Sequence, residues 1–325
     1  MTVLVTGATG FLGGHLAERL IEQGHRVRAL ARPTSNTSHL ESLDVDVVRG
    51  DVRDAGSLKG AVCGCTCVYH LAGATSQDNL AKSELYAINV EGTRKLAQAA
   101  LEAGVERFVY ASSSGVYGTI RTIPVDENSP VAPNSHYRRS KLIGEQVVRD
   151  LGRQHRLPVV TARISSAYGP RSGNWLGLFR AVAAGRLRIA GRGENHVQLG
   201  FASDIVEGIR LCGEVPHVEG RCYVIAGNEP IYLKTFVQMI ADELGTRCVV
   251  SSLPSWPFLL ADDVFQLAFR VAGLELPGAE VLDLHLGDRV FDLSRASTDL
   301  GYLPRTSLRD GLRRTLQWYR TNGLL

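Results

Sequence analysis

The amino-acid sequence predicts an α/β fold, in which a doubly wound parallel sheet is followed by a smaller mixed α/β C-terminal lobe. Two observations lead to this prediction. Short β-rich runs alternate with longer helical segments over the first half of the chain, as in a parallel sheet that helices cover on both faces. The 325 residues also exceed the usual size of a single domain, so an added lobe is expected.

The alternation places each element in turn. Strands are expected at residues 3–6, 26–31, 45–49, 67–71, 108–112 and 159–162. Helices are expected between them, over residues 12–23, 85–103 and 137–155. After Gly169-Pro170 the alternation decays, and only shorter strands follow, at 222–225 and 248–250. We therefore expect a first domain over 1–170, with return segments near 197–212, and a second lobe made mainly of 171–325.

The composition narrows the class of protein. Hydrophobic residues make up 44% of the chain and charged residues 21%, as in soluble globular proteins, and the net charge of +3 is too small to indicate nucleic-acid binding. No stretch of about 18 apolar residues occurs, since charged residues interrupt the most apolar late segment, 256–276. The first residues contain no leader signal. We expect a cytoplasmic protein with a small-molecule partner and no membrane span.

Six cysteines are present, and three of them, Cys63, Cys65 and Cys67, alternate at the start of a predicted strand with His70 nearby. Alternating residues of an extended chain point to one face, and the sequence contains no second cluster of metal ligands. We therefore expect reduced structural thiols and no metal site.

A glycine-rich loop joins the first predicted strand to the first predicted helix. Glycine has no Cβ, so it permits a tight turn and lets the backbone approach a pyrophosphate, while the helix N-terminus offers unpaired N–H groups and a positive dipole end. The pattern predicts a dinucleotide-binding loop. Its expected contacts are Gly7, Thr9, Gly10, Phe11, Leu12 and Gly13.

Tyr137 and Lys141 lie four residues apart in a predicted helix, so their side chains share one face. A phenol of pKa about 10 is a weak base at neutral pH, but a nearby ammonium favours the phenolate. Tyr137 can then exchange a proton with a substrate, while Lys141 supports the phenol and holds the cofactor ribose. Upstream, the predicted strand 108–112 ends in a serine-rich turn, and such sheets bind ligands at strand ends.

The Gly-x-x-Gly-x-x-Gly and Tyr-x-x-x-Lys motifs together resemble the short-chain dehydrogenase/reductase superfamily. The chain length and the long C-terminal lobe are similar to its extended branch, the NAD-dependent epimerase/dehydratase family. The resemblance implies a Rossmann-type sheet, a homodimer, and a catalytic hydroxyl on Ser113, four residues before Tyr117, with Ser114 as the fallback. It also implies cofactor contacts at Asp51, Val52, Leu71, Ala72, Gly73, Tyr137 and Lys141.

The end of the second predicted strand indicates which dinucleotide is used. An acid there would bind the ribose 2′-OH of NAD, whereas a cation would accept a 2′-phosphate. The sequence has Ala31 in place of the acid and Arg32 next to it, with hydroxyls at Ser35 and Thr37. NADP(H) is therefore favoured over NAD(H), with a solvated charge at Arg32 as the alternative.

The substrate is constrained by what the motifs lack. Dehydratases of the family carry an Asp-Glu pair where this chain has Ser114-Gly115, and sugar-nucleotide epimerases carry an Asn where it has Ser166. The apolar stretch around Trp256 resembles the 3-beta-hydroxysteroid dehydrogenase-like and dihydroflavonol reductase-like branch, although ordinary packing would give the same pattern. The candidate substrate contacts are Ser114, Ser166, Trp175, Phe179, His196 and Trp256.

These motifs predict an NADP(H)-linked oxidoreductase that reversibly reduces a ketone on a small molecule. Tyr137 is the proton donor, Ser113 orients the carbonyl and Lys141 supports both. A nucleotide-sugar epimerase using transient oxidation by the same residues is the alternative. A non-catalytic dinucleotide-sensing module is a weaker alternative, since it would normally lack the tyrosine or the lysine.

Overall fold

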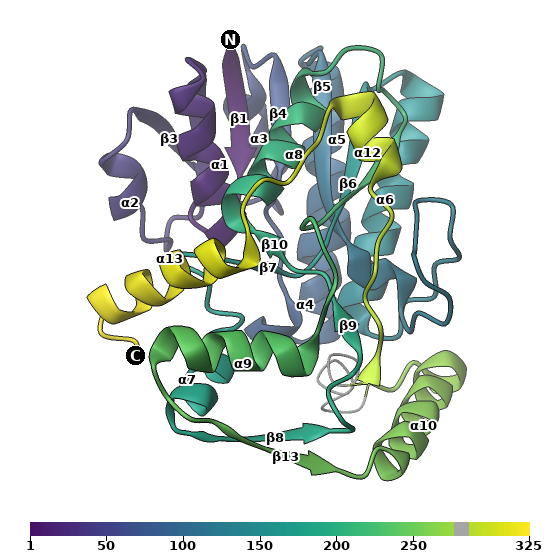
Figure 1. The fold of residues 1–325 in the computed structure, drawn as a ribbon. Helices are drawn as coiled ribbons and strands as arrows, with labels where there is room; N and C mark the ends of the chain where they lie inside the picture. Colours follow the sequence, from purple (N-terminus) through teal and green to yellow (C-terminus); the bar gives the residue numbers. More distant parts are fainter. Residues whose placement is uncertain (276–285) are drawn as a thin grey trace.

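A seven-stranded parallel sheet forms the centre of the computed structural model, which describes residues 1–275 and 286–325. This sheet confirms the predicted α/β class (Figure 1). Its order is β11-β6-β5-β4-β1-β2-β3, so the winding reverses between β1 and β4, where such sheets bind ligands beyond the carboxyl ends of the strands. The strands are β1 (Thr2–Thr6), β2 (Arg26–Ala31), β3 (Val45–Arg49), β4 (Cys67–His70), β5 (Arg107–Ser113), β6 (Val159–Ile164) and β11 (Cys222–Ile225).

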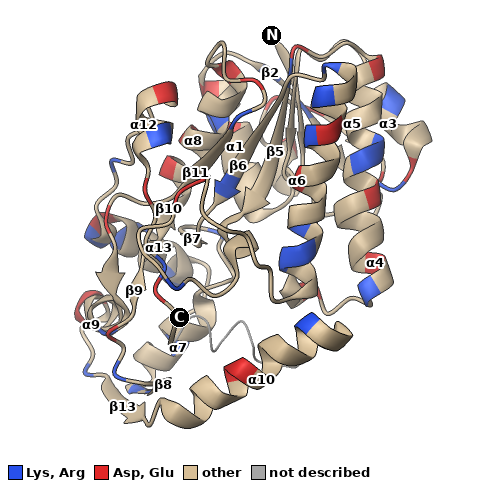
Figure 2. Cartoon of the chain, turned by 90° about the vertical axis from the view of Figure 1, so that its right-hand side faces the viewer, with Lys and Arg blue, Asp and Glu red and all other residues tan. Residues whose placement is uncertain are grey.

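Helices cover both faces of the sheet and bury its apolar strands. One face is covered by α1 (Phe11–Glu22), α8 (Ala202–Glu214) and α12 (Ser294–Leu300). The other is covered by α3 (Ala55–Val62), α5 (Thr93–Glu102) and α6 (His136–His155). Charged residues recur along α5 and α6 (Figure 2). Because both faces of β1 are buried, its residues Val3, Leu4 and Val5 are consecutive apolar residues and do not alternate with polar ones.

The predicted helix over residues 85–103 is interrupted in the structure. It consists of α4 (Lys82–Tyr86), a π-helical segment (Ala87–Gly92) and α5. The π-helical turn carries Asn89 into the protein interior. Such turns occur often at functional sites, and this one lies beside the loop that follows β4. Three shorter segments complete this half of the chain, α2 (Ser38–Glu41) and the 3₁₀ turns Ser76–Asp78 and Ser114–Tyr117.

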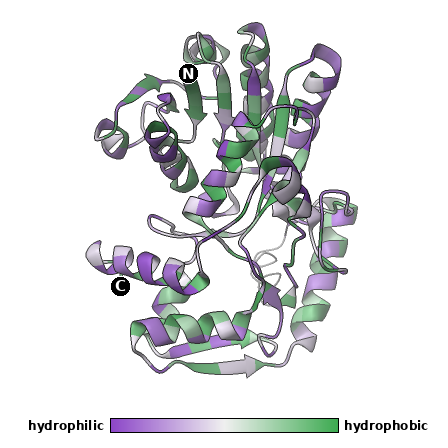
Figure 3. Ribbon diagram, turned by 45° about the horizontal axis from the view of Figure 1, so that its top comes forward, coloured by the Kyte–Doolittle hydropathy of each residue, from purple (hydrophilic) through white to green (hydrophobic). Residues whose placement is uncertain are grey.

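Within the described residues, the smaller lobe contains three two-stranded sheets and four helices, three of which share one apolar cluster. Its strands are β7 (Ala167–Tyr168), β8 (Arg186–Ala190), β9 (His196–Val197), β10 (Gly200–Phe201), β12 (Ile231–Tyr232) and β13 (Val249–Leu253). Its helices are α7 (Leu176–Ala183), α9 (Leu233–Leu244), α10 (Trp256–Ala272) and α13 (Leu308–Thr321). Hydrophobic residues colour much of α9 and α10 in Figure 3. The cluster joins α7, α9 and α13.

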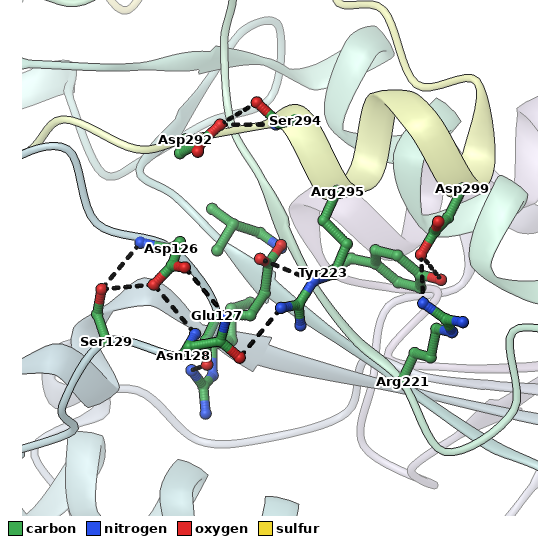
Figure 4. Close-up of polar contacts among 12 residues, drawn as sticks. Asp126, Glu127, Asn128, Ser129, Arg221, Tyr223, Asp292, Ser294, Arg295 and Asp299 are labelled. Carbon is green, nitrogen blue, oxygen red and sulfur yellow. Dashed lines mark hydrogen bonds and ion pairs between the residues drawn. The ribbon is translucent and has the colours of Figure 1, made fainter.

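The chain beyond residue 170 also returns to the large sheet. Strand β11 pairs in parallel with β6, and α12 packs against β11 and α8. Figure 4 shows the polar contacts that hold this return: Arg295 pairs with Glu127 (3.4 Å), and Asp299 accepts hydrogen bonds from Arg221 (2.9 Å) and the Tyr223 hydroxyl (3.0 Å). Residues of the 171–325 segment therefore contribute to both parts of the fold.

Candidate active site

The glycine loop after β1 packs directly on the loop after β4. Gly7 has a φ of +76°, which favours glycine, and a Cβ there would lie 2.7 Å from the backbone nitrogen of Ala72. A Cβ on Gly13 would overlap the carbonyl oxygen of Gly7. The structure thus brings together the predicted contacts of residues 7–13 and 71–73.

Gly10 is the N-cap of α1, and no side chain caps this helix. The first N–H groups of a helix have no partner within the helix, and the dipole makes this end positive. The loop therefore leaves backbone donors and space where a side chain would otherwise stand. These features fit the pyrophosphate of a dinucleotide.

Lys141 is buried at the carboxyl end of the sheet, with only 6% of its surface exposed. Its Nζ lies 4.7 Å from the centroid of the Tyr110 ring. A Cβ on Gly73 would lie 3.8 Å from the same Nζ atom. Burial lowers the pKa of Lys141 from 10.5 to about 8, against an opposing effect of Glu145. The ammonium thus sits between β5 and the loop after β4, one helical turn from Tyr137.

Ser113 ends β5, and its hydroxyl accepts a hydrogen bond from the backbone N–H of Gly115 (3.0 Å). A Cβ on Gly115 would lie 3.1 Å from the Ser113 Oγ and 3.0 Å from the Arg138 Cγ. The absence of this Cβ lets the first turn of α6 pack against the serine turn. Ser113 is half-buried, whereas Ser114 is buried, so Ser113 is the more accessible of the two candidate hydroxyls.

The amide of Asn89 connects the loop after β4 to α6. Its oxygen accepts from the Ala74 N–H (2.7 Å), and its nitrogen donates to the Ala74 carbonyl (2.9 Å) and the Ser140 hydroxyl (2.9 Å). The Ser140 hydroxyl donates in turn to the Tyr137 carbonyl (2.7 Å). This chain of bonds sets the position of the first turn of α6 relative to the loop after β4.

A buried ion pair between Glu145 on α6 and Arg163 on β6, which the sequence analysis missed, lies next to the end of β5. Arg163 on β6 donates to both oxygens of Glu145, at 3.0 and 2.8 Å, and Ser112 donates to the same carboxylate at 2.5 Å. Arg163 also donates to the Tyr117 hydroxyl at 3.1 Å. The sequence signal for this pair was an arginine inside the mostly apolar strand β6, together with a glutamate four residues after Lys141 on the buried face of a helix.

The residues predicted to bind a 2′-phosphate, Arg32, Ser35 and Thr37, follow the end of β2. Arg32 is exposed, and its charge helps to lower the pKa of Asp51, although a side-chain hydrogen bond from Arg53 is the largest cause. Thr37 is buried and donates its hydroxyl proton to Glu41 at 2.8 Å. Arg32 is therefore open to solvent, whereas the Thr37 hydroxyl is bonded within the protein.

The six candidate substrate residues do not converge on one surface. Phe179 is fully buried and Trp175 is 6% exposed, and both pack in the core of the smaller lobe. Contrary to our expectation, packing explains these two aromatic rings, and they have no free face for a ligand. His196 bonds Asp288 (2.9 Å), whereas Ser166 is exposed.

Trp256 is 65% exposed and lines a cavity of about 660 Å³. Segments 191–195 and 252–256 form most of its wall, together with Leu259 and Leu286. The cavity lies in the smaller lobe, between the ends of β8 and β13 and the start of α10.

The comparisons with known proteins agree with this geometry. Residues 3–226 match the model of the NAD dependent epimerase/dehydratase family. The chain belongs to this family. Family members use nicotinamide dinucleotides, and they include oxidoreductases, epimerases and dehydratases.

Three relatives illustrate the range of these enzymes. Sterol demethylase protein B of Methylococcus capsulatus is 30% identical, with 100% of both chains covered. The 3 beta-hydroxysteroid dehydrogenase/Delta 5-->4-isomerase of Mycobacterium tuberculosis strain H37Rv is 29% identical over 98% of this chain and 90% of its own. The structure of DesIV, a dTDP-glucose 4,6-dehydratase from Streptomyces venezuelae with NAD bound, has a TM-score of 0.80 at 28% identity, covering 99% and 98%.

Two structural features are absent from the described residues, a bilayer-spanning helix and a cluster of metal ligands. None of their helices combines the length and apolar character needed to cross a bilayer. Within residues 1–275 and 286–325, no group of three or more His, Cys, Asp or Glu side chains is arranged to hold a metal ion.

Proposed function

We propose that this protein is an NADP(H)-preferring reductase that reversibly converts a ketone on a small molecule into a secondary alcohol. The observation that carries this proposal is the buried ammonium of Lys141, held over Tyr110 and beside Gly73, one helical turn from Tyr137. A nicotinamide dinucleotide, with its pyrophosphate at the glycine loop, would supply or accept the hydride.

Tyr137 would donate the proton that the reduced oxygen needs. Its phenolate, formed as the proton leaves, is stabilised by the nearby positive charge of Lys141. Because the pKa of Lys141 is about 8, the ammonium form dominates at neutral pH. Ser113, at the end of β5, would orient the carbonyl oxygen by a hydrogen bond.

A reductase is preferred to a dehydratase because Ser114-Gly115 stands where elimination chemistry needs an acid and a base. The names of two similar proteins, a sterol demethylase component and a 3 beta-hydroxysteroid dehydrogenase, support an apolar cyclic substrate. An epimerase would use the same three residues and remains the second candidate, since solved structures with this fold include sugar-nucleotide epimerases.

The deciding experiment measures cofactor stoichiometry. The protein would be incubated with NADPH and a panel of cyclic ketones, and with UDP-sugars as the alternative substrates. We expect NADPH loss equal to the alcohol formed. Turnover of a UDP-sugar without net change in added cofactor would reject the reductase in favour of an epimerase.

The preference for NADP(H) rests on Arg32, which is exposed at the end of β2 where the 2′-phosphate would lie. We also expect a homodimer, as the family resemblance implies. Light scattering of the full chain measures its mass, and a monomer at all concentrations would contradict this expectation.

A further inference from the structure

One end of the smaller lobe carries a dense apolar surface. Among the described residues, 16 large hydrophobic side chains are exposed, and ten of them lie between Val249 and Leu274. This segment is a small fraction of the chain, so the exposed apolar side chains are concentrated there. Contiguous apolar patches mark contact sites far more often than scattered residues do.

Most of these side chains form a stripe along α10. Trp256, Leu260, Val264, Leu267 and Val271 follow at intervals of three or four residues and are between 58% and 77% exposed. At 3.6 residues per turn, they share one side of the helix. We call these five residues the α10 stripe.

The opposite side of α10 packs against the start of α6. Phe269 is 3% exposed, and its ring lies 5.1 Å from the His136 ring and 4.8 Å from the Arg139 guanidinium. Gln266 also donates to the Thr119 hydroxyl at 2.9 Å. These contacts hold α10 by one side, so the stripe faces away from the catalytic domain.

Cations border the apolar surface. Strands β8 and β13 pair in parallel, β13 leads into α10, and all three lie at the end of the molecule opposite the N-terminus (Figures 1 and 2). Residues 184–194 and 245–275 contain five arginines and four acidic residues, of which Glu194 pairs with Lys234 (2.8 Å) and Glu275 accepts a hydrogen bond from the His136 N–H (2.7 Å). The arginines, all exposed, are Arg186, Arg188, Arg192, Arg247 and Arg270.

We propose that this end of the smaller lobe docks on an anionic lipid surface. The α10 stripe would enter the boundary between head groups and acyl chains, with Trp256 at the interface, while the arginines contact lipid phosphates. Trp256 and Leu259 also line the 660 Å³ cavity, so docking places that cavity against the lipid.

The charges favour a lipid surface over a second copy of the chain. A symmetric dimer through the stripe would bring two sets of arginines together, and like charges repel at an interface. Insertion across the bilayer is disfavoured because α10 has only 17 residues and contains Asp262, Asp263 and Arg270. Docking on a lipid surface requires neither contact between two sets of arginines nor burial of these charged residues in the bilayer core.

The test is sedimentation of the full-length protein with vesicles. One set contains phosphatidylcholine with phosphatidylglycerol, and the other contains phosphatidylcholine alone. We expect binding to the anionic vesicles, weakening as salt rises, and at least about tenfold weaker binding to the neutral vesicles. No sedimentation with anionic vesicles at low salt would overturn the proposal.

Three variants locate the binding surface. Leu260→Asp with Leu267→Asp should abolish sedimentation, and Arg186→Gln with Arg188→Gln should weaken it roughly 30-fold, at about 1 kcal/mol per arginine. Leu303→Asp, at a residue 60% exposed and outside this surface, is the matched control and should bind normally.

All substituted side chains are exposed, so thermal unfolding should confirm that each variant is folded. Equal loss in the Leu303 control would overturn the assignment. So would a wild-type dimer that ignores vesicles and becomes monomeric in the Leu260/Leu267 variant, because a second copy would then occupy the stripe.

Discussion

The ammonium group of Lys141 lies 4.7 Å from the centroid of the Tyr110 ring, in a position almost closed to solvent. The ring face offers the cation an electrostatic contact in place of the water that burial removed. Burial also raises the pKa of Tyr110 well above its usual value, so that ring stays neutral. The nearest opposite charge along the helix is Glu145, which is bonded to Arg163. Lys141 therefore holds its proton more weakly than a surface lysine does.

Lys141→Met should stabilise the cofactor-free protein at pH 7. Below pH 8 the folded and unfolded states both carry the proton, so the full cost of burying the charge is present. Between pH 8 and 10.5 the folded state loses the proton first, and the stability of the wild type rises with pH. We expect the variant to gain about 1 to 3 kcal/mol at pH 7, with the gain shrinking across that interval.

Urea unfolding at several pH values measures this effect. Lys59→Met is the control, because Lys59 is 74% exposed and should show no comparable trend. A gain for Lys141→Met that stays constant from pH 7 to 10.5 would show that burial of the charge is not its cause.

Tyr137→Phe should abolish ketone reduction while leaving dinucleotide affinity within about threefold of the wild type. The phenyl ring keeps the packing of the first turn of α6 but cannot donate a proton. Single-turnover hydride transfer and fluorescence titration with NADPH measure the two properties. Retained turnover would remove Tyr137 from its role as acid.

The Glu145–Arg163 pair should behave as a coupled unit. Glu145→Leu alone should cost about 3 to 5 kcal/mol because it leaves the Arg163 guanidinium buried without its partner. Adding Arg163→Met should recover most of that loss. A double-mutant cycle by urea unfolding measures the coupling, and additive losses would contradict it.

The exposed pair of Lys59 and Glu102, 3.7 Å apart, is the matched control for this cycle. Its coupling should stay below about 1 kcal/mol because water screens both charges. In the Glu145 variants, kcat should fall more than the affinity for NADPH, since Ser112 loses its acceptor beside Ser113.

Arg32→Ala should weaken NADPH binding about tenfold more than NADH binding, because the loss of a guanidinium removes a charge-assisted hydrogen bond to a phosphate. Arg26→Ala, at the exposed opposite end of β2, is the control and should change neither affinity. Calorimetric titration with both cofactors measures the ratio. Equal weakening of the two would exclude a phosphate contact at Arg32.

Gly13→Ala should destabilise the fold by more than about 1 kcal/mol and weaken dinucleotide binding, because its Cβ would overlap the Gly7 carbonyl. Gly60→Ala is the control: it lies in α3 with open space around it and should stabilise by up to about 1 kcal/mol. Unfolding midpoints with and without NADPH measure both effects. An unchanged midpoint for Gly13→Ala would show that the loop has room for a side chain.

The local pattern predicted much of the fold. Strands at 26–31, 45–49 and 222–225 appear with the predicted bounds, because the side-chain pattern of a buried strand is a local property. The helix predicted over 85–103 was divided by a π-helical turn, where Asn89 meets residues distant in sequence. Hydrophobic periodicity does not report such contacts.

The sequence by itself determined the α/β class, the glycine loop and the position of Tyr137 and Lys141 one turn apart on the same helix, because each follows from spacing along one or two adjacent elements. Only the tertiary structure decided that Tyr110 and Gly73 surround the ammonium and that Phe179 belongs to a core. It also decided which side of α10 remains exposed. An apolar helix reads the same whether its second face meets protein or water, so burial is settled only when distant elements pack together.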